Sequence, residues 1–204
     1  ISNVRFRLTL LKSSRLERIN PDSGHLRIND GNLILAPTSA GWSLLCHARN
    51  SDALKTLRTL KHRGVESGFT ILVDSDARLN RLVSEVPSIG WDILDTSDGN
   101  LILILPEGKN VAKEALAADN SIAIRMVKDP AERKLVQMVN GPVATTALLD
   151  ESGKPVDDPE EAEKTVLDEV DYLLNLPTLS KLKDKKQFPI VKLDLNGEVK
   201  IIRP

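Results

Sequence analysis

Short apolar runs alternate along this chain with segments whose apolar residues recur at helical spacing. Five runs predict strands, at residues 32–36, 69–73, 101–105, 121–127 and 141–148. Several of these runs are apolar without alternation, as expected for strands that are covered on both faces. Between the first two runs, residues 51–63 place leucines on one face of a predicted helix. This order is typical of an α/β layer fold.

Local signals predict where several elements begin or turn. Residues 129–132 and 158–161 each place Asp before Pro and Glu, which is typical of a helix start. Near the end of the chain, Asn196-Gly197 separates two apolar runs and predicts a β-hairpin. The basic residues 1–30 fit the alternation poorly. They are interpreted either as an edge strand with a long loop or as the remnant of an extension that docks elsewhere.

The chain has no internal repeat and no low-complexity linker, so one domain over residues 1–204 is predicted. It would comprise a basic N-terminal extension or edge segment (1–30), a core (31–175) and C-terminal strands (176–204). A hydrophobic content of 41% is enough to build a core. No apolar run approaches the roughly 18 residues that a membrane span needs, so no membrane partner is expected.

The first residue and the cysteine content bear on the compartment. Because the chain begins with Ile rather than Met, we expect a processed form from which any targeting segment has been removed. The single cysteine, Cys46, excludes an internal disulfide and is compatible with a reducing compartment. The expected location is therefore intracellular, in the cytoplasm or in an organelle matrix or stroma.

Charge is segregated along the chain although the net charge is only −1. Residues 49–64 hold five cations against one aspartate, whereas residues 150–169 hold nine acids against two lysines. Such segregation can focus an electrostatic field on a ligand, or it can reflect solvated helix faces.

Common catalytic and nucleotide-binding motifs are absent. The chain has neither a GxxxxGK[ST] phosphate loop nor a GxGxxG turn. Its three histidines and one cysteine lack the spacing of metal ligands, so no metal site is predicted. What remains is a set of polar or aromatic residues at strand and helix ends: Thr38, Ser39, Trp42, Lys61, His62, Arg63, Arg125, Thr145, Thr146 and Arg203.

Each of these candidates also has a structural interpretation. Arg125 lies within an apolar strand, where its charge requires an anion, a water-filled cavity, a solvent-facing edge or a carboxylate partner. Lys61 and Arg63 follow a helix, where cations interact favourably with the helix dipole. Trp42 either stacks on a ligand or packs in the core.

Six segments follow one another along the chain: PTSAGWSLLC, KHR, GFTILV, DGNLILIL, SIAIRMV and PVATTAL, and the chain ends with KIIRP. In order and spacing they resemble the YrdC/YciO-type threonylcarbamoyl-adenylate synthase family. The resemblance implies a twisted mixed α/β sheet with helices around a positively charged cavity. Synthases of this family make threonylcarbamoyl-adenylate from threonine, bicarbonate and ATP, on the route to a modified tRNA adenosine.

The resemblance also implies roles for individual residues. It assigns phosphate, nucleotide or RNA binding to Thr38, Lys61, Arg63 and Arg203. It assigns carboxylate or substrate binding to Arg125 and Thr145, with Trp42 as a stacking residue. No catalytic residue follows from it. ATP with magnesium is the implied cofactor pair if synthase activity is retained.

The sequence departs from the synthase pattern at several of these segments. Ser67 stands where the family has a second lysine, and residues 147–149 read Ala-Leu-Leu rather than Ser-Ala-Asn. Phe188-Pro189 replaces a Ser-Thr pair, and Ser39-Ala40 replaces Asp-Thr. These changes indicate a degenerate active site. The segments GW, GFTIL and DGN, together with the missing Asn, resemble the YciO branch more than the synthase branch.

Three functional hypotheses follow. The first is a YciO-like protein that binds a nucleotide or RNA, with weak or altered activity. The second is a non-catalytic structural subunit of a larger assembly that contains protein partners and RNA. The third is an active threonylcarbamoyl-adenylate synthase.

Overall fold

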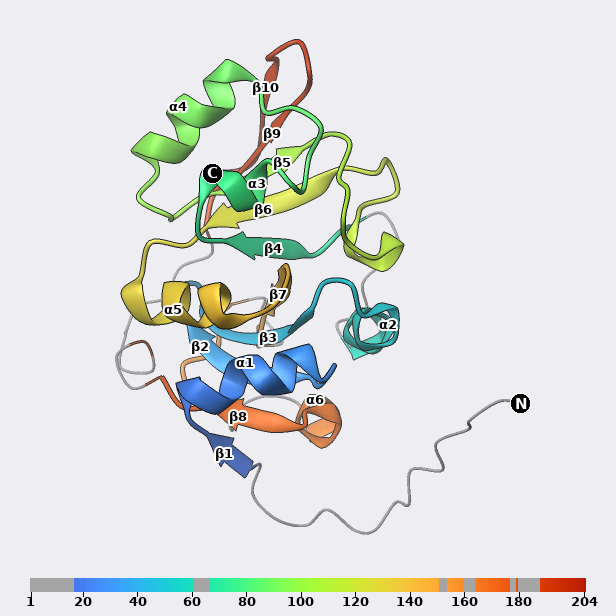
Figure 1. Ribbon diagram of the computed structural model, residues 1–204, viewed down its shortest axis with the longest axis vertical. Coiled ribbons are helices and arrows are strands. Elements are labelled where there is room, and N and C mark those ends of the chain that lie inside the picture. Colours follow the sequence, from blue (N-terminus) through green and yellow to red (C-terminus); the bar gives the residue numbers. More distant parts are fainter. Residues whose placement is uncertain (1–16, 61–66, 151–153, 160–163, 177–178, 180–187) are drawn as a thin grey trace, which may run out of the picture.

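The computed structural model describes residues 17–60, 67–150, 154–159, 164–176, 179 and 188–204 (Figure 1). All ten strands in that part of the chain belong to one mixed sheet, in the order β1-β8-β2-β3-β7-β4-β6-β5-β9-β10. The strands are β1 (Glu17–Ile19), β2 (Ile34–Thr38), β3 (Gly41–His47), β4 (Thr70–Val73), β5 (Ile102–Leu105), β6 (Ile122–Met126), β7 (Val143–Ala147), β8 (Tyr172–Leu174), β9 (Ile190–Leu193) and β10 (Val199–Arg203). The predicted α/β fold with a mixed sheet is confirmed.

The helices flank both faces of this sheet. They are α1 (Pro21–Asn29), α2 (Ser51–Leu60), α3 (Asp76–Leu79), α4 (Ser88–Thr96), α5 (Pro130–Met138), α6 (Lys164–Glu169) and the 3-10 turn η1 (Lys113–Ala115). Alternate residues of β2 face opposite ways: Leu35 packs in the core that contains Leu54 of α2, whereas Ile34 packs in the core that contains Leu135 of α5. Figure 1 shows α1 and α5 side by side in front of the sheet.

The five predicted strands each overlap an observed one, but the sequence reading missed the strand that follows the first of them. β3 pairs antiparallel with β2 from Thr38↔Gly41 to Ile34↔Leu45, so the two form a hairpin around Ser39 and Ala40. Gly41 has a φ of 108°, which favours glycine. The hairpin explains why the apolar sequence resumes immediately after Pro37 and Thr38.

The N-terminal segment differs from its prediction. An edge strand is present, because β1 pairs with β8 at one side of the sheet. The predicted long loop is wrong, however, since residues 21–29 form α1. Asn20 caps this helix by accepting a hydrogen bond from the Ser23 amide at 2.9 Å, and Pro21 starts it. Gly24 lies inside α1 because a Cβ there would meet Leu174 at 2.8 Å. Residues 1–16 lie outside the described residues.

The C-terminal hairpin is confirmed. β9 and β10 pair antiparallel, and Gly197 turns the chain with a φ of 84°. β9 also pairs in parallel with β5, which joins the hairpin to the sheet. The helix start predicted at 129–132 is likewise confirmed as that of α5, whereas the one at 158–161 falls partly on residues outside the described part.

No helix in the described part of the chain is long and apolar enough to cross a membrane.

Candidate functional site

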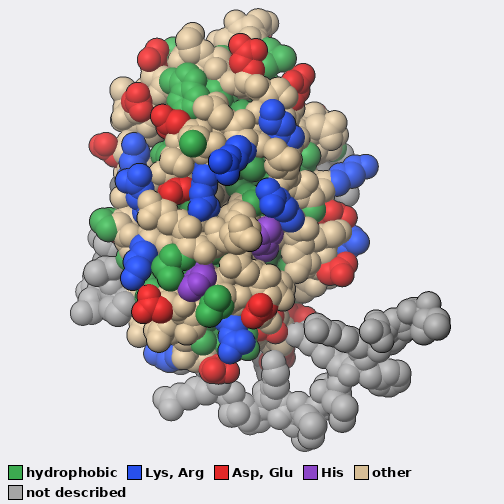
Figure 2. Space-filling view, viewed as in Figure 1, with side chains coloured by type: hydrophobic (Ala, Val, Ile, Leu, Met, Phe, Trp, Pro, Cys, Tyr) green, Lys and Arg blue, Asp and Glu red, His purple; other side chains and the backbone are tan. Residues whose placement is uncertain are grey.

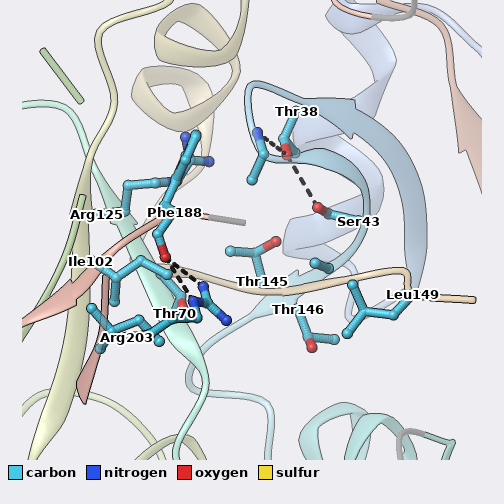
Figure 3. A pocket seen from close by; sticks show the side chains of 13 residues that line it. Thr38, Ser43, Thr70, Ile102, Arg125, Thr145, Thr146, Leu149, Phe188 and Arg203 are labelled. Carbon is cyan, nitrogen blue, oxygen red and sulfur yellow. Dashed lines mark hydrogen bonds between the residues drawn. The ribbon is translucent and has the colours of Figure 1, made fainter. Parts of the chain in front are cut away.

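A pocket of about 290 Å³ opens between the ends of several strands (Figure 3). Its lining joins hydroxyls, two guanidinium groups and apolar side chains. The described lining residues are Thr38, Ala40, Ser43, Thr70, Ile102, Arg125, Thr145, Thr146, Ala147, Leu149, Phe188, Ile190 and Arg203. Four residues with predicted roles therefore lie in one pocket: Thr38, Arg125, Thr145 and Arg203. The departures at Leu149 and Phe188 fall on the same lining and supply part of its apolar surface.

The first guanidinium belongs to Arg125, which is only 1% exposed. Nη1 and Nη2 of Arg125 donate to the two carboxylate oxygens of Glu132, a pair that is itself buried. Nη1 also donates to Ser39 Oγ at 2.6 Å, and Ser39 Oγ donates to Glu132 Oε2 at 2.7 Å. Arg125, Glu132 and Ser39 thus form a closed network, which we call the Arg125 network. Of the alternatives open for this arginine, the structure shows a carboxylate partner in the wall of a pocket.

The start of α5 places Glu132 in this network. Only residues 127–129 connect β6 to α5. Asp129 caps the helix by accepting hydrogen bonds from the amides of Ala131 and Glu132, both at 2.9 Å. A glutamate three residues after an N-cap commonly reaches back toward the cap. Here the Glu132 side chain contacts Arg125 instead.

Thr38 and Ser43 form a second internally bonded group, on neighbouring strands of the β2–β3 hairpin. Thr38 Oγ1 donates to the Gly41 carbonyl at 2.8 Å and accepts from the Ala40 amide at 3.2 Å. It also lies 3.1 Å from Ser43 Oγ, as Figure 3 shows. Both hydroxyls are buried, and these bonds hold the tight turn that borders the pocket.

Thr145 differs from both groups. Its side chain lies on β7 opposite Thr70 of β4 and is 6% exposed. The Oγ1 atom is buried and has no hydrogen-bond partner among the described residues. Figure 3 shows Thr145 between the Thr38–Ser43 pair and the Phe188–Arg203 pair. A buried hydroxyl without a partner is unfavourable, so this atom is suited to receive a ligand.

Phe188 lies between the two guanidinium groups of the lining. Its ring centroid is 5.5 Å from Cζ of Arg125. Its carbonyl oxygen accepts hydrogen bonds from Nε of Arg203 at 2.9 Å and from Nη2 at 2.6 Å. These two bonds orient the Arg203 guanidinium at the pocket. Burial lowers the pKa of Arg203 from its usual high value.

Three residues to which the resemblance assigns binding roles, Trp42, Lys61 and Arg63, are not part of the described lining. Trp42 is buried in the core, where its indole N–H donates to the Asp157 carbonyl at 2.9 Å, so its position is that of a packing residue. Lys61 and Arg63 lie outside the described residues. Ser67, which stands where the family has a lysine, is exposed and offers its carbonyl to Arg58.

Metal and thiol chemistry find little support in the described part of the chain. No group of three or more His, Cys, Asp or Glu side chains there could hold a metal ion. The described lining contains no acidic side chain, so it offers Mg²⁺ no carboxylate ligand. Burial raises the pKa of the Cys46 thiol to about 12, so a reactive thiolate is not available there.

Sequence reasoning missed Glu132 and Phe188 as parts of the site. The sequence pattern indicates Glu132 only as a helix-start residue, and its place three positions after the cap is the one signal of its role. Phe188 had been noted only as the loss of a Ser-Thr pair. Its ring and its carbonyl each contact one arginine, which no sequence pattern predicts.

Comparisons with known proteins identify a matching family and individual relatives of this chain. The family model Sua5/YciO/YrdC, described as "Telomere recombination", matches residues 27–204. The threonylcarbamoyl-AMP synthase of Pseudoalteromonas translucida (strain TAC 125) is 26% identical over 172 residues, which are 83% of this chain and 90% of the synthase.

Two solved structures are similar in fold. Escherichia coli YciO has a TM-score of 0.78 and 20% identity, and the match covers 93% of this chain and 95% of YciO. P. abyssi Sua5 complexed with L-threonine has a TM-score of 0.78 and 17% identity, and the match covers 94% of this chain but 57% of Sua5. These likenesses establish the fold, while the family model spans most of the sequence. The chain therefore belongs to the Sua5/YciO/YrdC family.

Proposed function

We propose that this chain is a YciO-like protein that binds an adenine nucleotide, free or at the end of an RNA, in the pocket between Thr38, Thr145 and Arg203. The observation that carries the proposal is the buried Thr145 hydroxyl, which has no partner among the described residues and lies in a pocket whose lining includes Arg203. A ribose or a phosphate oxygen would satisfy that hydroxyl, and Arg203 would bind a phosphate through a charge-assisted hydrogen bond.

The composition of the lining supports a ligand that is partly polar and partly flat. Leu149, Ile102 and Phe188 offer apolar surface beside the hydroxyls. A volume of about 290 Å³ is at the lower end of small-molecule pockets. The relatives include threonylcarbamoyl-AMP synthases, whose name contains an adenylate. ATP is therefore a candidate as well as AMP, with Lys61 and Arg63 as the proposed further phosphate contacts.

Altered or weak chemistry is the second part of the proposal. Arg125 is the proposed carboxylate-binding residue, yet Glu132 already occupies its guanidinium. Formation of an adenylate from ATP needs several fixed cations around the phosphates. Because Glu132 pairs with Arg125, this cation is not available for that task, so we expect weak or altered activity.

RNA is the proposed macromolecular partner. Figure 2 shows Lys and Arg side chains gathered across the middle of one face of the molecule. Because the net charge is −1, attraction to RNA has to arise from such local basic surface. Binding that depends on these cations should weaken steeply as salt is raised.

Calorimetric titration with AMP tests the proposal. We expect saturable binding to the wild-type protein, and binding at least ten times weaker in Arg203→Gln. The matched control is Lys200→Gln, which removes an exposed cation from the same strand. No binding of AMP or ATP up to about 10 mM, an affinity too weak to matter, would overturn the proposal. Formation of threonylcarbamoyl-AMP from ATP, threonine and bicarbonate at ordinary enzyme rates would establish an active synthase instead.

A non-catalytic structural subunit is the second candidate, and exposed apolar residues on the C-terminal hairpin favour it. Leu195, Val199, Ile201 and Ile202 are 47–68% exposed, and β10 is the last strand of the sheet. Apolar groups gathered on an edge strand are suited to an interface. A sedimentation profile of the protein in its own cell extract tests this role. A subunit would migrate in a large particle, whereas a free nucleotide-binding protein would migrate as a small, unassembled protein.

A further inference from the structure

The Arg125 network contains all the polar partners of this arginine that the structure describes. Glu132 accepts from both terminal nitrogens of Arg125, and Ser39 bridges the two side chains. The Ser39 amide also points to Glu132 Oε2, at 3.4 Å. The carboxylate thus has four donors around it. This is a complete site for one carboxylate, and the protein's own glutamate fills it.

The position of this network matters because Glu132 occupies a guanidinium that lines the pocket. Arg125 lines the pocket, whereas Glu132 lies behind it on α5 and is not among the lining residues. A guanidinium binds a carboxylate best through two parallel hydrogen bonds. A ligand carboxylate that sought this geometry at Arg125 would have to displace Glu132. The displaced side chain is 1% exposed where it stands, so it would lose its only compensating charge.

We propose that Glu132 is an internal counter-ion that sets the ligand specificity of the pocket. It neutralises the Arg125 end, so that free amino acids and other carboxylates are excluded there. The anionic group of the ligand is directed to the Arg203 end, and an uncharged part of the ligand lies near Arg125. The inference rests on the proposed function only in requiring that the pocket binds a ligand.

A purely structural ion pair would use the same contacts, and the two roles differ in what removal of the charge does. If Glu132 only stabilises the fold, Glu132→Gln lowers stability and leaves ligand preference unchanged. If Glu132 sets specificity, the same change leaves Arg125 with a positive charge in the pocket wall. Carboxylates then gain affinity, because the glutamine retains the shape of the side chain but not its charge.

The test is calorimetric titration of L-threonine into the wild-type protein and into Glu132→Gln. We expect no saturable binding in the wild type and at least a tenfold gain in the variant. L-threonine amide, which lacks the carboxylate, should show no gain. Glu85→Gln is the matched control, because it removes an exposed glutamate and should behave as the wild type. Equal L-threonine binding by wild type and Glu132→Gln would overturn the proposal.

A measurement on the wild-type protein covers the case in which Glu132→Gln does not fold. The guanidinium N–H signals of Arg125 can be followed by NMR during titration with L-threonine. Unchanged signals support exclusion of the carboxylate, and saturable shifts overturn it. AMP binding is measured separately on the same sample. Its absence would overturn the proposed function, whereas the L-threonine result would still decide the role of Glu132.

Discussion

The two arginines of the pocket are held in opposite ways. Arg125 is bound to a carboxylate and a hydroxyl, and the whole group is buried. Arg203 is bound to a neutral carbonyl and lies in the same lining as the unpartnered Thr145 hydroxyl. The comparison teaches that one residue type can be buried in an internal ion pair at one end of a pocket and lie only partly buried at the other. The two ends therefore differ in the groups that orient the guanidinium: a buried carboxylate at Arg125 and the Phe188 carbonyl at Arg203.

The largest expected effect is at the Arg125 end. Arg125→Met leaves the Glu132 charge buried without compensation, which should lower the free energy of unfolding by about 3–5 kcal/mol. The double variant Arg125→Met/Glu132→Leu removes both charges and should recover most of that loss. Urea unfolding of the three proteins measures the effect. A loss under about 1 kcal/mol in the single variant, as for an exposed ion pair, would contradict a buried structural pair.

At the Arg203 end, the expected effect is on ligand binding. Arg203→Gln should weaken AMP binding by about 1.5–3 kcal/mol, roughly 10- to 150-fold, because a charge-assisted hydrogen bond is lost. Lys200→Gln should leave AMP affinity as it was. Calorimetry measures both variants. If Arg203→Gln bound AMP as well as the wild type does, the functional contrast between the two arginines would disappear.

Two threonines of the lining allow a smaller, matched comparison. Thr38→Val removes a hydroxyl that bonds to Gly41 and Ala40, and should lower the free energy of unfolding by about 1–2 kcal/mol. Thr145→Val removes a hydroxyl without a described partner, and should leave stability unchanged or raise it by up to about 1 kcal/mol.

For AMP binding the order of the two effects should be reversed, with the larger loss of affinity in Thr145→Val. Thr145→Val should weaken AMP binding by about 0.5–1.5 kcal/mol, the usual contribution of one hydrogen bond. Thr38→Val should weaken it less, because its hydroxyl is already bonded within the turn. Thermal unfolding and calorimetry on both variants give the four values. Equal destabilisation of the two would mean that Thr145 has a structural partner.

The smallest expected effect is at Asp119, which forms an ion pair with Lys192. This contact joins the loop before β6 to β9. β9 also contains Ile190, which lines the pocket. The hydrogen bond from Lys192, then that from Ser121, lowers the pKa of Asp119 to about 2. A depressed pKa stabilises the fold above the unfolded-state value of about 3.9. That contribution is lost as the pH falls through about 2.

Asp119→Asn should therefore lower stability only slightly at neutral pH, by less than about 1 kcal/mol, as for other exposed ion pairs. The difference from the wild type should shrink as the pH falls toward 2, where the wild-type carboxyl is half protonated, and should vanish below that pH. Unfolding curves at several pH values measure it. A difference that instead grew toward low pH would show that the contact with Lys192 does not hold in solution.

Much of the sheet could be predicted from the sequence because its strands are buried and apolar. The start of α5 was equally clear, since Asp129 and Pro130 both favour a helix start. α1 was missed because Gly24 and the polar residues around it obscure the helical pattern. A Cβ at this glycine would come within 2.8 Å of the Leu174 side chain, which is distant in sequence, so the reason for the glycine is not local. Sequence signals therefore predict an element correctly where residues adjacent in the sequence determine it.

The site was less accessible to sequence reasoning. The candidates Thr38, Arg125, Thr145 and Arg203 could be named, and the structure brings them to one pocket. Which of them remains available to a ligand depends on partners such as Glu132, seven residues beyond Arg125 and across a strand–helix connection. Residue type gives no indication of this, because burial of an arginine is unfavourable without a counter-charge and tolerated with one.

The most direct test of the account follows both ends of the pocket at once. NMR titration of the wild-type protein with AMP reports the Arg125 and Arg203 guanidinium signals and the Thr145 methyl signal in one experiment. The account predicts saturable shifts at Arg203 and Thr145, with Arg125 unchanged. Shifts centred on Arg125, with Arg203 and Thr145 unmoved, would contradict it.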